Sequence, residues 1–399
     1  MKLTRALEWW GRWTKFTPPF LHFLAAASLY NFGMFLFVLV YNLYLLDLGH
    51  TEQLLGWVAA AATAGSIAGA LPAGWLGRTM GLGRTVVVCF TGSAFVCALR
   101  SQATGETTLI GEAFLGGILV ALWMVSMAPV IARLTTPERR PLGFSLFFGC
   151  GIGLGIVGGL VGGRLPGWLT GWELAAGPLE AKRATLLAGC GFMALAALAA
   201  QRLPVLSDEA ASASPNYPRG PFIRRYLTVF AVWNLATGAF NPFFNAFLSR
   251  LGASMEQIGS AFSGGQLAQL FAMGLAPLLY RRFGLVAGIS GAMVLTAVSL
   301  GGLAASDAVI AGALAYCFYM AFQWMSEPGL YSLLMNNVRP EEQSGASSLN
   351  FLVIASAQAL AAAAAGVAFE RLGYAPALSA AAAIALLAAL LLSRFRKGG

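Results

Sequence analysis

Long apolar stretches separated by short polar segments follow one another along the whole chain. A helix needs about 20 mainly apolar residues to cross a bilayer, and most of these stretches have that length. The predicted spans are residues 20–46, 54–76, 85–99, 108–131, 142–163, 184–200, 226–248, 257–280, 286–305, 308–332, 346–367 and 375–392. The pattern therefore predicts an all-α membrane protein with twelve transmembrane helices.

Composition excludes two other classes. Of 399 residues, 58% are hydrophobic and only 10% are charged, whereas a soluble domain carries roughly 25% charged residues. An ordinary soluble enzyme is therefore excluded, and so is a disordered chain, which would be polar and highly charged.

The positive charges indicate the orientation. If the spans alternate from a cytoplasmic N-terminus, 19 of the 25 Lys and Arg residues lie on the cytoplasmic side. We therefore interpret the net charge of +9 as a topology signal rather than a nucleic-acid surface. Both termini are expected in the cytoplasm, with the chain in the inner or plasma membrane.

An internal repeat divides the chain. At an offset of 203 residues Asn31 matches Asn234, Asn42 matches Asn245, and Gly56 matches Gly259. A constant offset predicts two pseudo-symmetric six-helix bundles of parallel orientation. The expected parts are an interfacial helix (1–19), a first bundle (20–201), a cytoplasmic linker (202–225), a second bundle (226–393) and a cytoplasmic tail (394–399).

The loop between the second and third spans carries a family motif. The stretch from Gly74 to Arg84 resembles the Gly-x-Leu-Ala-Asp-Arg-x-Gly-Arg-Arg motif of the major facilitator superfamily (MFS), with Arg78 in place of the aspartate. The resemblance implies a secondary transporter that works by alternating access, with spans 1, 4, 7 and 10 around a central cavity. In the family the missing carboxylate latches the two halves together.

Other charges could replace that latch. Arg78 could pair with Glu341 or Glu342, and by symmetry Arg281 or Arg282 with Glu138. The alternative is that these are solvated loop charges. The candidate latch residues are Arg78, Arg84, Glu138, Arg281, Arg282, Glu341 and Glu342.

Small residues recur every four positions on the helices that the family packs across its two halves. Such stripes let helix backbones approach closely. We expect seams at Ala61, Gly65, Gly69, Ala73 and Gly77; at Gly151, Gly155, Gly159 and Gly163; at Ser260, Gly264, Ala268, Ala272 and Ala276; and at Ala357, Ala361 and Ala365.

Polar side chains inside the spans are the candidate substrate contacts. An amide that faces lipid would lack partners, so these residues should face protein or water. They either join helices or bind substrate. The cavity candidates are Asn31, Asn42, Trp123, Asn234, Asn241, Asn245, Tyr316, Tyr319 and Gln323.

Glu112 and Glu327 are the two acids within the predicted spans. Apolar surroundings favour the neutral, protonated form of a carboxyl group. Either residue could carry a coupling proton, with Glu327 the first choice because its helix face is the more polar. The alternative is an acid near a helix end that reaches headgroups or a backbone partner.

The sequence favours a proton-coupled transporter. Its solute is expected to be small and neutral, amphipathic or cationic, because no Lys or Arg stands in the middle of a predicted span. A lipid or lysolipid flippase and an uncoupled facilitator remain alternatives, while a membrane-embedded enzyme lacks a catalytic cluster. We expect a monomer in the lipid bilayer, with no cofactor, metal or nucleic-acid partner.

Overall fold

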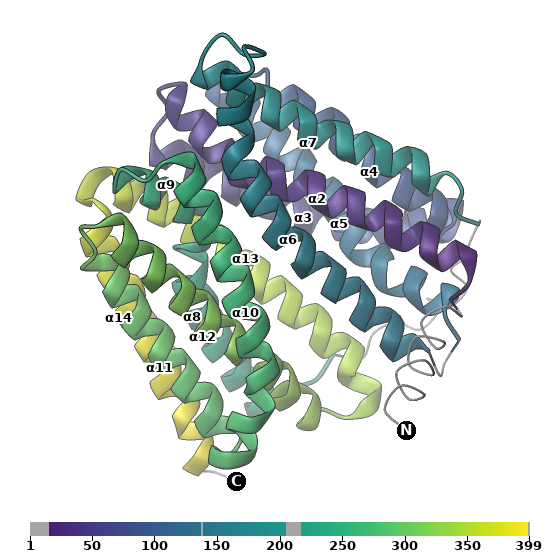
Figure 1. Cartoon of the computed structure of the whole chain (residues 1–399). Helices are drawn as coiled ribbons and strands as arrows, with labels where there is room; N and C mark the ends of the chain where they lie inside the picture. Colours follow the sequence, from purple (N-terminus) through teal and green to yellow (C-terminus); the bar gives the residue numbers. More distant parts are fainter. Residues whose placement is uncertain (1–15, 137–138, 205–216, 398–399) are drawn as a thin grey trace, which may run out of the picture.

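The computed structural model describes residues 16–136, 139–204 and 217–397 (Figure 1). Most of the predicted interfacial helix and the middle of the predicted linker lie outside these residues, as does Glu138. The described residues form helices joined by short loops, and no strand occurs among them. The all-α prediction is confirmed.

Twelve spans arranged as two halves make up the molecule. The first half consists of α2 (Pro18–Asp47), α3 (Glu52–Met80), α4 (Leu82–Arg100), α5 (Glu106–Leu134), α6 (Arg140–Gly171) and α7 (Pro178–Ala200). The second consists of α8 (Pro221–Gly238), η1 (Asn241–Phe243), α9 (Phe244–Arg250), α10 (Met255–Phe283), α11 (Leu285–Ala304), α12 (Val309–Asn336), η2 (Pro340–Glu342), α13 (Gln343–Leu372), α14 (Tyr374–Ser393) and η3 (Arg394–Lys397).

The seventh span is broken, whereas the sequence pattern predicts one continuous helix. The α-helix α8 ends at Gly238 and resumes as α9 at Phe244, with the short turn η1 between them. Pro242 lies within η1, and a proline has no backbone N–H to donate and clashes with the preceding helical turn. Irregular backbone at membrane depth is tolerated where protein or a cavity surrounds it.

The surface of the molecule suits a lipid environment. Ten helices of the described residues are long and apolar enough to span a membrane, and the broken α8–α9 and the more polar α10 complete the twelve. Large apolar side chains such as Phe95 (64% exposed) and Phe271 (63% exposed) point outward. Such a surface is costly in water and is satisfied by lipid.

The internal repeat is also present in the backbone. Gly81 separates α3 from α4 with φ 81°, and Gly284, 203 residues later, separates α10 from α11 with φ 83°. A side chain at this φ is strained, so glycine permits the same tight connection in both halves.

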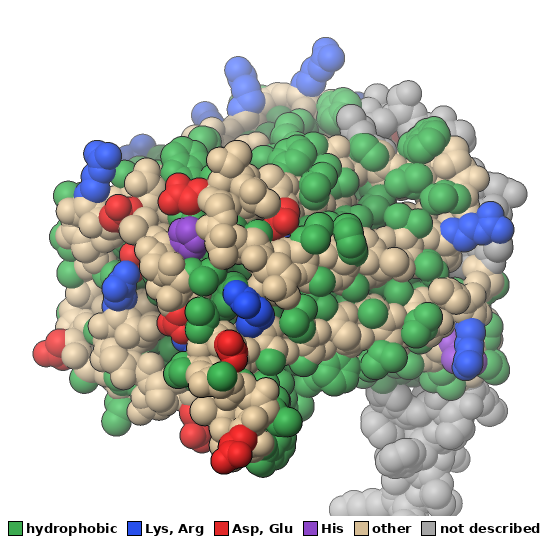
Figure 2. Space-filling view, turned by 90° about the horizontal axis from the view of Figure 1, so that it is seen from above, with side chains coloured by type: hydrophobic (Ala, Val, Ile, Leu, Met, Phe, Trp, Pro, Cys, Tyr) green, Lys and Arg blue, Asp and Glu red, His purple; other side chains and the backbone are tan. Residues whose placement is uncertain are grey.

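The two halves meet at one end only of the molecule as Figure 1 shows it: they lie together near α9 and diverge toward the chain ends. We call the end near α9 the far end and the end near the chain termini the terminal end. Helix α3 packs on α13, and α6 packs on α10, as the family resemblance implied. Figure 2 shows the molecule from above the view of Figure 1. Acidic and basic side chains gather on part of the face seen there, and hydrophobic side chains cover much of the rest.

Candidate functional site: a cavity between the halves

A cavity of about 700 Å³ lies between the two halves. Its walls come from α2, α3, α4 and α5 of the first half and from α8, η1, α9, α12 and α13 of the second. Small-molecule sites usually have volumes of about 300–1,000 Å³. Of the predicted cavity residues, those that line it are Asn42, Asn234, Asn241, Asn245 and Gln323.

The predicted aromatic residues lie behind the cavity wall instead. Trp123 is buried inside the first half, with its ring 5.1 Å from that of Phe90. Tyr316 stacks on Phe244 at 4.7 Å between ring centroids. These rings fill the bundle interiors because large flat side chains bury the most apolar area there. Asn31, on α2, is likewise not among the lining residues.

Tyr319 supports the cavity from behind. Its hydroxyl donates to Asn241 Oδ1 at 2.7 Å and so holds a lining side chain beside the break in the seventh span. Asn234 is held in a similar way, because Gln358 Nε2 donates to its Oδ1 at 3.1 Å. Gln323 differs, since its Oε1 is buried without a hydrogen-bond partner. That oxygen remains available to a bound molecule.

Asn42 and Asn245 join the two halves at the far end of the cavity. Asn42 Nδ2 donates to the carbonyl oxygen of Pro242 at 2.5 Å, and Asn245 Nδ2 donates to that of Leu39 at 2.8 Å. The two donors, Asn42 and Asn245, are 203 residues apart, and so are the two acceptors, Leu39 and Pro242. Each half therefore repeats the contact of the other. Asn42 Nδ2 also reaches Asn245 Oδ1 at 3.2 Å. We call this reciprocal arrangement the asparagine clasp.

The asparagine clasp should fail when either amide is lost. Asn245→Ala removes the buried hydrogen bond to the carbonyl oxygen of Leu39, and such a bond contributes about 0.5–1.5 kcal/mol. Because the two residues share one network, Asn42→Ala combined with Asn245→Ala should cost less than the sum of the single changes. Thermal unfolding of the purified variants measures this, and Asn31→Ala on the same helix is the matched control. Strictly additive effects would contradict the shared network.

Charged groups also cross between the halves at the far end. Arg250 Nε donates to Glu52 Oε1 at 2.6 Å and its Nη2 to Glu52 Oε2 at 3.1 Å. The Glu52 side chain is only 7% exposed. A two-point contact between guanidinium and carboxylate is among the stronger polar interactions in proteins.

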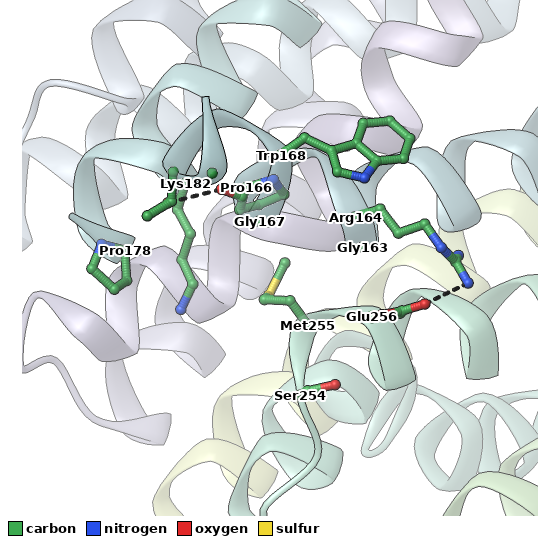
Figure 3. Close-up of a pocket in the computed structure, with 12 residues that line it drawn as sticks. Gly163, Arg164, Pro166, Gly167, Trp168, Pro178, Lys182, Ser254, Met255 and Glu256 are labelled. Atoms are coloured by element: carbon green, nitrogen blue, oxygen red, sulfur yellow. Dashed lines mark hydrogen bonds and ion pairs between the residues drawn. The ribbon is translucent and has the colours of Figure 1, made fainter. Parts of the chain in front are cut away.

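A surface hollow at this end contains a second cross-link, shown in Figure 3. Arg164 Nη2 of α6 lies 2.7 Å from Glu256 Oε1 of α10, and Trp168 lies on the same side of the hollow as Arg164. Lys182, which also lines the hollow, is paired with Asp47 at 2.6 Å. These charged side chains thus have protein partners, and the hollow belongs to the closure of the far end.

Glycine backbones touch across the halves at two equivalent places. A Cβ added to Gly259 would lie 2.7 Å from the Cα of Gly163, and one added to Gly56 would lie 3.0 Å from that of Gly366. The two pairs are related by the offset of 203 residues. Real Cβ atoms essentially never come within 3.0 Å of another heavy atom, and a Cβ at Gly56 would also lie 2.5 Å from the carbonyl oxygen of Ala362, so both positions require glycine while the far end is closed.

The predicted seams are correct only in part. On α6 the contact runs through Gly159 and Gly163 as expected. On α3, Gly65 and Gly69 pack on α5 within the same half, and the contact between halves is at Gly56. On α10 the contact between the halves follows the neighbouring face, through Gly259 and Ser263. On α13 it runs through Ala362 and Gly366. Stripes on several faces of one helix do not reveal which face meets which partner.

Glu327 faces the cavity from α12. Its Oε1 accepts a hydrogen bond from Trp233 Nε1 at 3.3 Å. The side chain lies near the rings of Tyr226, Tyr319 and Tyr331 in the second half. Glu112 is not among the lining residues, and its Oε2 is buried without a hydrogen-bond partner.

Arg100 is a cavity residue that the sequence reasoning missed. It lies one residue beyond the predicted third span, 85–99, but it is the last residue of α4 and lines the cavity. Its guanidinium carbon lies 4.2 Å from the ring centroid of Tyr41. The signal available in the sequence was the short predicted third span, which left this arginine one residue beyond its end.

The candidate latch residues that the structure describes lie at the terminal end. Arg78, Arg281 and Arg282 occupy the last turns of α3 and α10, and Arg84 is in the first turn of α4. In the described part of the chain no ion pair joins Arg78 to Glu341 or Glu342, which form part of η2. The pairing with Glu138 falls outside the described residues. The latch therefore stays a prediction.

Comparisons with known proteins agree with this architecture. The family model described as Major Facilitator Superfamily matches residues 21–362. The chain is similar to the solved structure of the nucleoside transporter NupG, with 14% identity, a TM-score of 0.75, and 96% of this chain and 100% of that chain covered. A D-xylose-proton symporter has 17% identity, a TM-score of 0.70, and coverage of 94% and 97%.

A bacterial homologue of the iron transporter ferroportin, solved in an inward-facing state, is also similar. It shares 15% identity with a TM-score of 0.74, and 94% of this chain and 98% of that chain are covered. A comparison with curated proteins found no match. At these identities the structural likeness concerns the fold alone.

Proposed function

Because the chain belongs to the major facilitator superfamily, we propose that it is a secondary active transporter that moves a small amphipathic solute by alternating access, coupled to protons. The observation that carries this proposal is the cavity of about 700 Å³ between two repeated halves. Hydrogen bonds and ion pairs between the halves close its far end. Moving the contact from one end to the other would expose the same cavity to the other side of the membrane.

We assign the terminal end to the cytoplasm, in the inner or plasma membrane. The support is the excess of Lys and Arg on the side of the predicted termini. The far end then faces outward, and the described state has its outer mouth closed. The asparagine clasp, the pair of Arg250 with Glu52 and the glycine contacts form the outer gate in this proposal.

Glu327 is the proposed proton carrier. It combines a position on the cavity wall with a hydrogen bond from Trp233. A carboxyl group that gains a proton from one side and loses it to the other couples the solute to the proton gradient.

Reconstitution tests the proposed function. Purified protein in liposomes is screened against labelled small solutes with and without an imposed pH gradient. At least one solute should accumulate under the gradient, and a protonophore should abolish the accumulation. Solutes that bind in a thermal-shift screen but never cross the membrane would contradict transport, while crossing that ignores the gradient would contradict coupling.

The terminal-end latch should appear only when that end closes. A salt bridge between surface groups contributes about 0–1 kcal/mol, which suits a contact that breaks in each cycle. Arg78→Glu should slow transport, and Glu341→Arg or Glu342→Arg in the same chain should restore it. Initial uptake rates measure the effect. The matched control is Arg339→Glu, in the loop that holds Glu341 and Glu342. A double variant as slow as Arg78→Glu alone would rule the latch out.

A further inference from the structure

Arg100 places a half-buried positive charge on the wall of the cavity. Its Nε is buried and has no hydrogen-bond partner. The guanidinium lies over the rings of Tyr41 and Phe37, at 4.2 and 5.3 Å from their centroids. Stacking on aromatic faces holds a cation in place, but it provides no acceptor for Arg100 Nε.

Two other polar atoms around Arg100 are also unsatisfied. The hydroxyl oxygen of Tyr41 and Oε2 of Glu112 are buried and have no hydrogen-bond partner. Glu112 interacts with Arg100 through space, yet no ion pair between them occurs in the described residues. Buried polar groups are nearly always hydrogen-bonded, and a cluster without partners calls for an explanation.

The cluster opens to the cavity. Tyr41 and Arg100 line it together with Ser93 and Cys97 from α4 and Gly116 from α5. Gly116 leaves room beside the guanidinium, since a Cβ added there would lie 3.8 Å from Arg100 Nη1. A molecule in the cavity can therefore reach the guanidinium without passing through the bundle.

We propose that this part of the cavity binds the carboxylate of a small organic acid or zwitterion, and that the rest of the molecule lies against the apolar wall. The Arg100 guanidinium and the Tyr41 hydroxyl donate hydrogen bonds to the carboxylate oxygens. This refines the proposed function, on which it rests, by naming a substrate class. It also changes the expectation of a neutral, amphipathic or cationic solute, which was based on the absence of Lys and Arg from the middle of the predicted spans.

A single negative charge fits better than two. Arg100 supplies one positive charge, and no other Lys or Arg of the described residues lines the cavity. The subsite therefore favours a monocarboxylate over a dicarboxylate or a phosphate ester. A guanidinium also matches the planar carboxylate group in geometry.

Ligand-induced thermal stabilisation tests the subsite without any transport assay. The purified protein in chloride-free buffer is heated with acetate, hexanoate, benzoate or phenylalanine, and with the amide of each acid. A ligand that binds the folded state raises the melting temperature. At least one acid should raise it more than its amide does, and Arg100→Gln should lose this difference.

Control variants separate the causes. Arg164→Gln, which removes an arginine at the far end, should keep the difference between acid and amide. Tyr41→Phe should reduce it, and Arg100→Lys should retain part of it. The melting-temperature difference needs neither transport nor a pH gradient, so a failure of proton coupling and a failure of the subsite give different results.

Two outcomes would overturn the proposal. The first is that acids and amides shift the melting temperature of the unmodified protein equally, a comparison that does not depend on whether the Arg100 variants fold. The second is that chloride produces the same Arg100-dependent shift as the acids, which would identify a general anion site.

Discussion

Replacing Gly259 with valine is expected to force the two halves apart at the far end. In the closed arrangement a Cβ at this position would lie 2.7 Å from the Cα of Gly163. The obstruction is backbone, so no side chain can rotate away to relieve it. Overpacking of this kind costs about 1–3 kcal/mol or more. Since 1.4 kcal/mol changes an equilibrium tenfold, the population should shift toward a state open at the far end.

The repeat supplies an independent copy of this experiment. Gly366→Val places a Cβ against the backbone of Glu52 and Gly56, at the equivalent crossing of α13 and α3. It should produce the same shift as Gly259→Val. Gly274→Val is the matched control, because Gly274 also lies on α10 but has open space around it.

Distance measurements report the shift directly. Spin labels are placed at Leu174 and Asp307, which are exposed residues in far-end loops of the two halves. The distance between the labels should lengthen in Gly259→Val and Gly366→Val and stay unchanged in Gly274→Val. An unchanged distance in both crossing variants would show that the glycine contacts do not control the gate.

Replacing Glu327 with glutamine should abolish proton-driven accumulation. Glutamine keeps the size of the side chain and a carbonyl oxygen that can accept from Trp233, but it cannot exchange a proton at neutral pH. A solute transported by the unmodified protein should then equilibrate across the membrane instead of accumulating under a pH gradient. Uptake into liposomes with and without the gradient measures this.

A spectroscopic measurement needs no transported solute. Because Trp233 donates to Glu327, its fluorescence should change as the carboxyl group gains or loses a proton. This pH-dependent component should disappear in Glu327→Gln and in Trp233→Phe. Glu112→Gln is the comparison, since Glu112 lies near Arg100 instead. Full gradient-driven uptake by Glu327→Gln would refute the assignment, and a loss confined to Glu112→Gln would transfer the role to that residue.

The predictions from sequence were accurate where a local pattern has one structural solution. Apolar stretches about as long as the bilayer is thick predicted the spans, because every backbone polar group in lipid must be paired within a helix. The seventh span was the exception. Pro242 interrupts its helix, and only the partners of Asn241 and Asn245 show how the irregular backbone is accommodated.

The residues around the cavity were harder to predict because a helix has several faces. Asn42 and Trp123 were both expected on the cavity wall, yet Asn42 lines it and Trp123 lies in the interior of the first half. Arg100 stands at the end of an apolar run, one residue outside the predicted third span. The end of α4 lies beside α2 and α5, where neighbouring aromatic rings bury the guanidinium.

The sequence alone determined the membrane class, the twelve spans, the division into repeated halves and the resemblance to the family. Those properties follow from hydrophobic length and from an offset of 203 residues, which are written in the order of the residues. Only the tertiary structure decided that Asn42 meets Pro242, that Gly259 meets Gly163, and that Arg100 faces a cavity. These contacts join residues far apart in the chain, and helix rotation and packing, which local periodicity does not specify, bring them together.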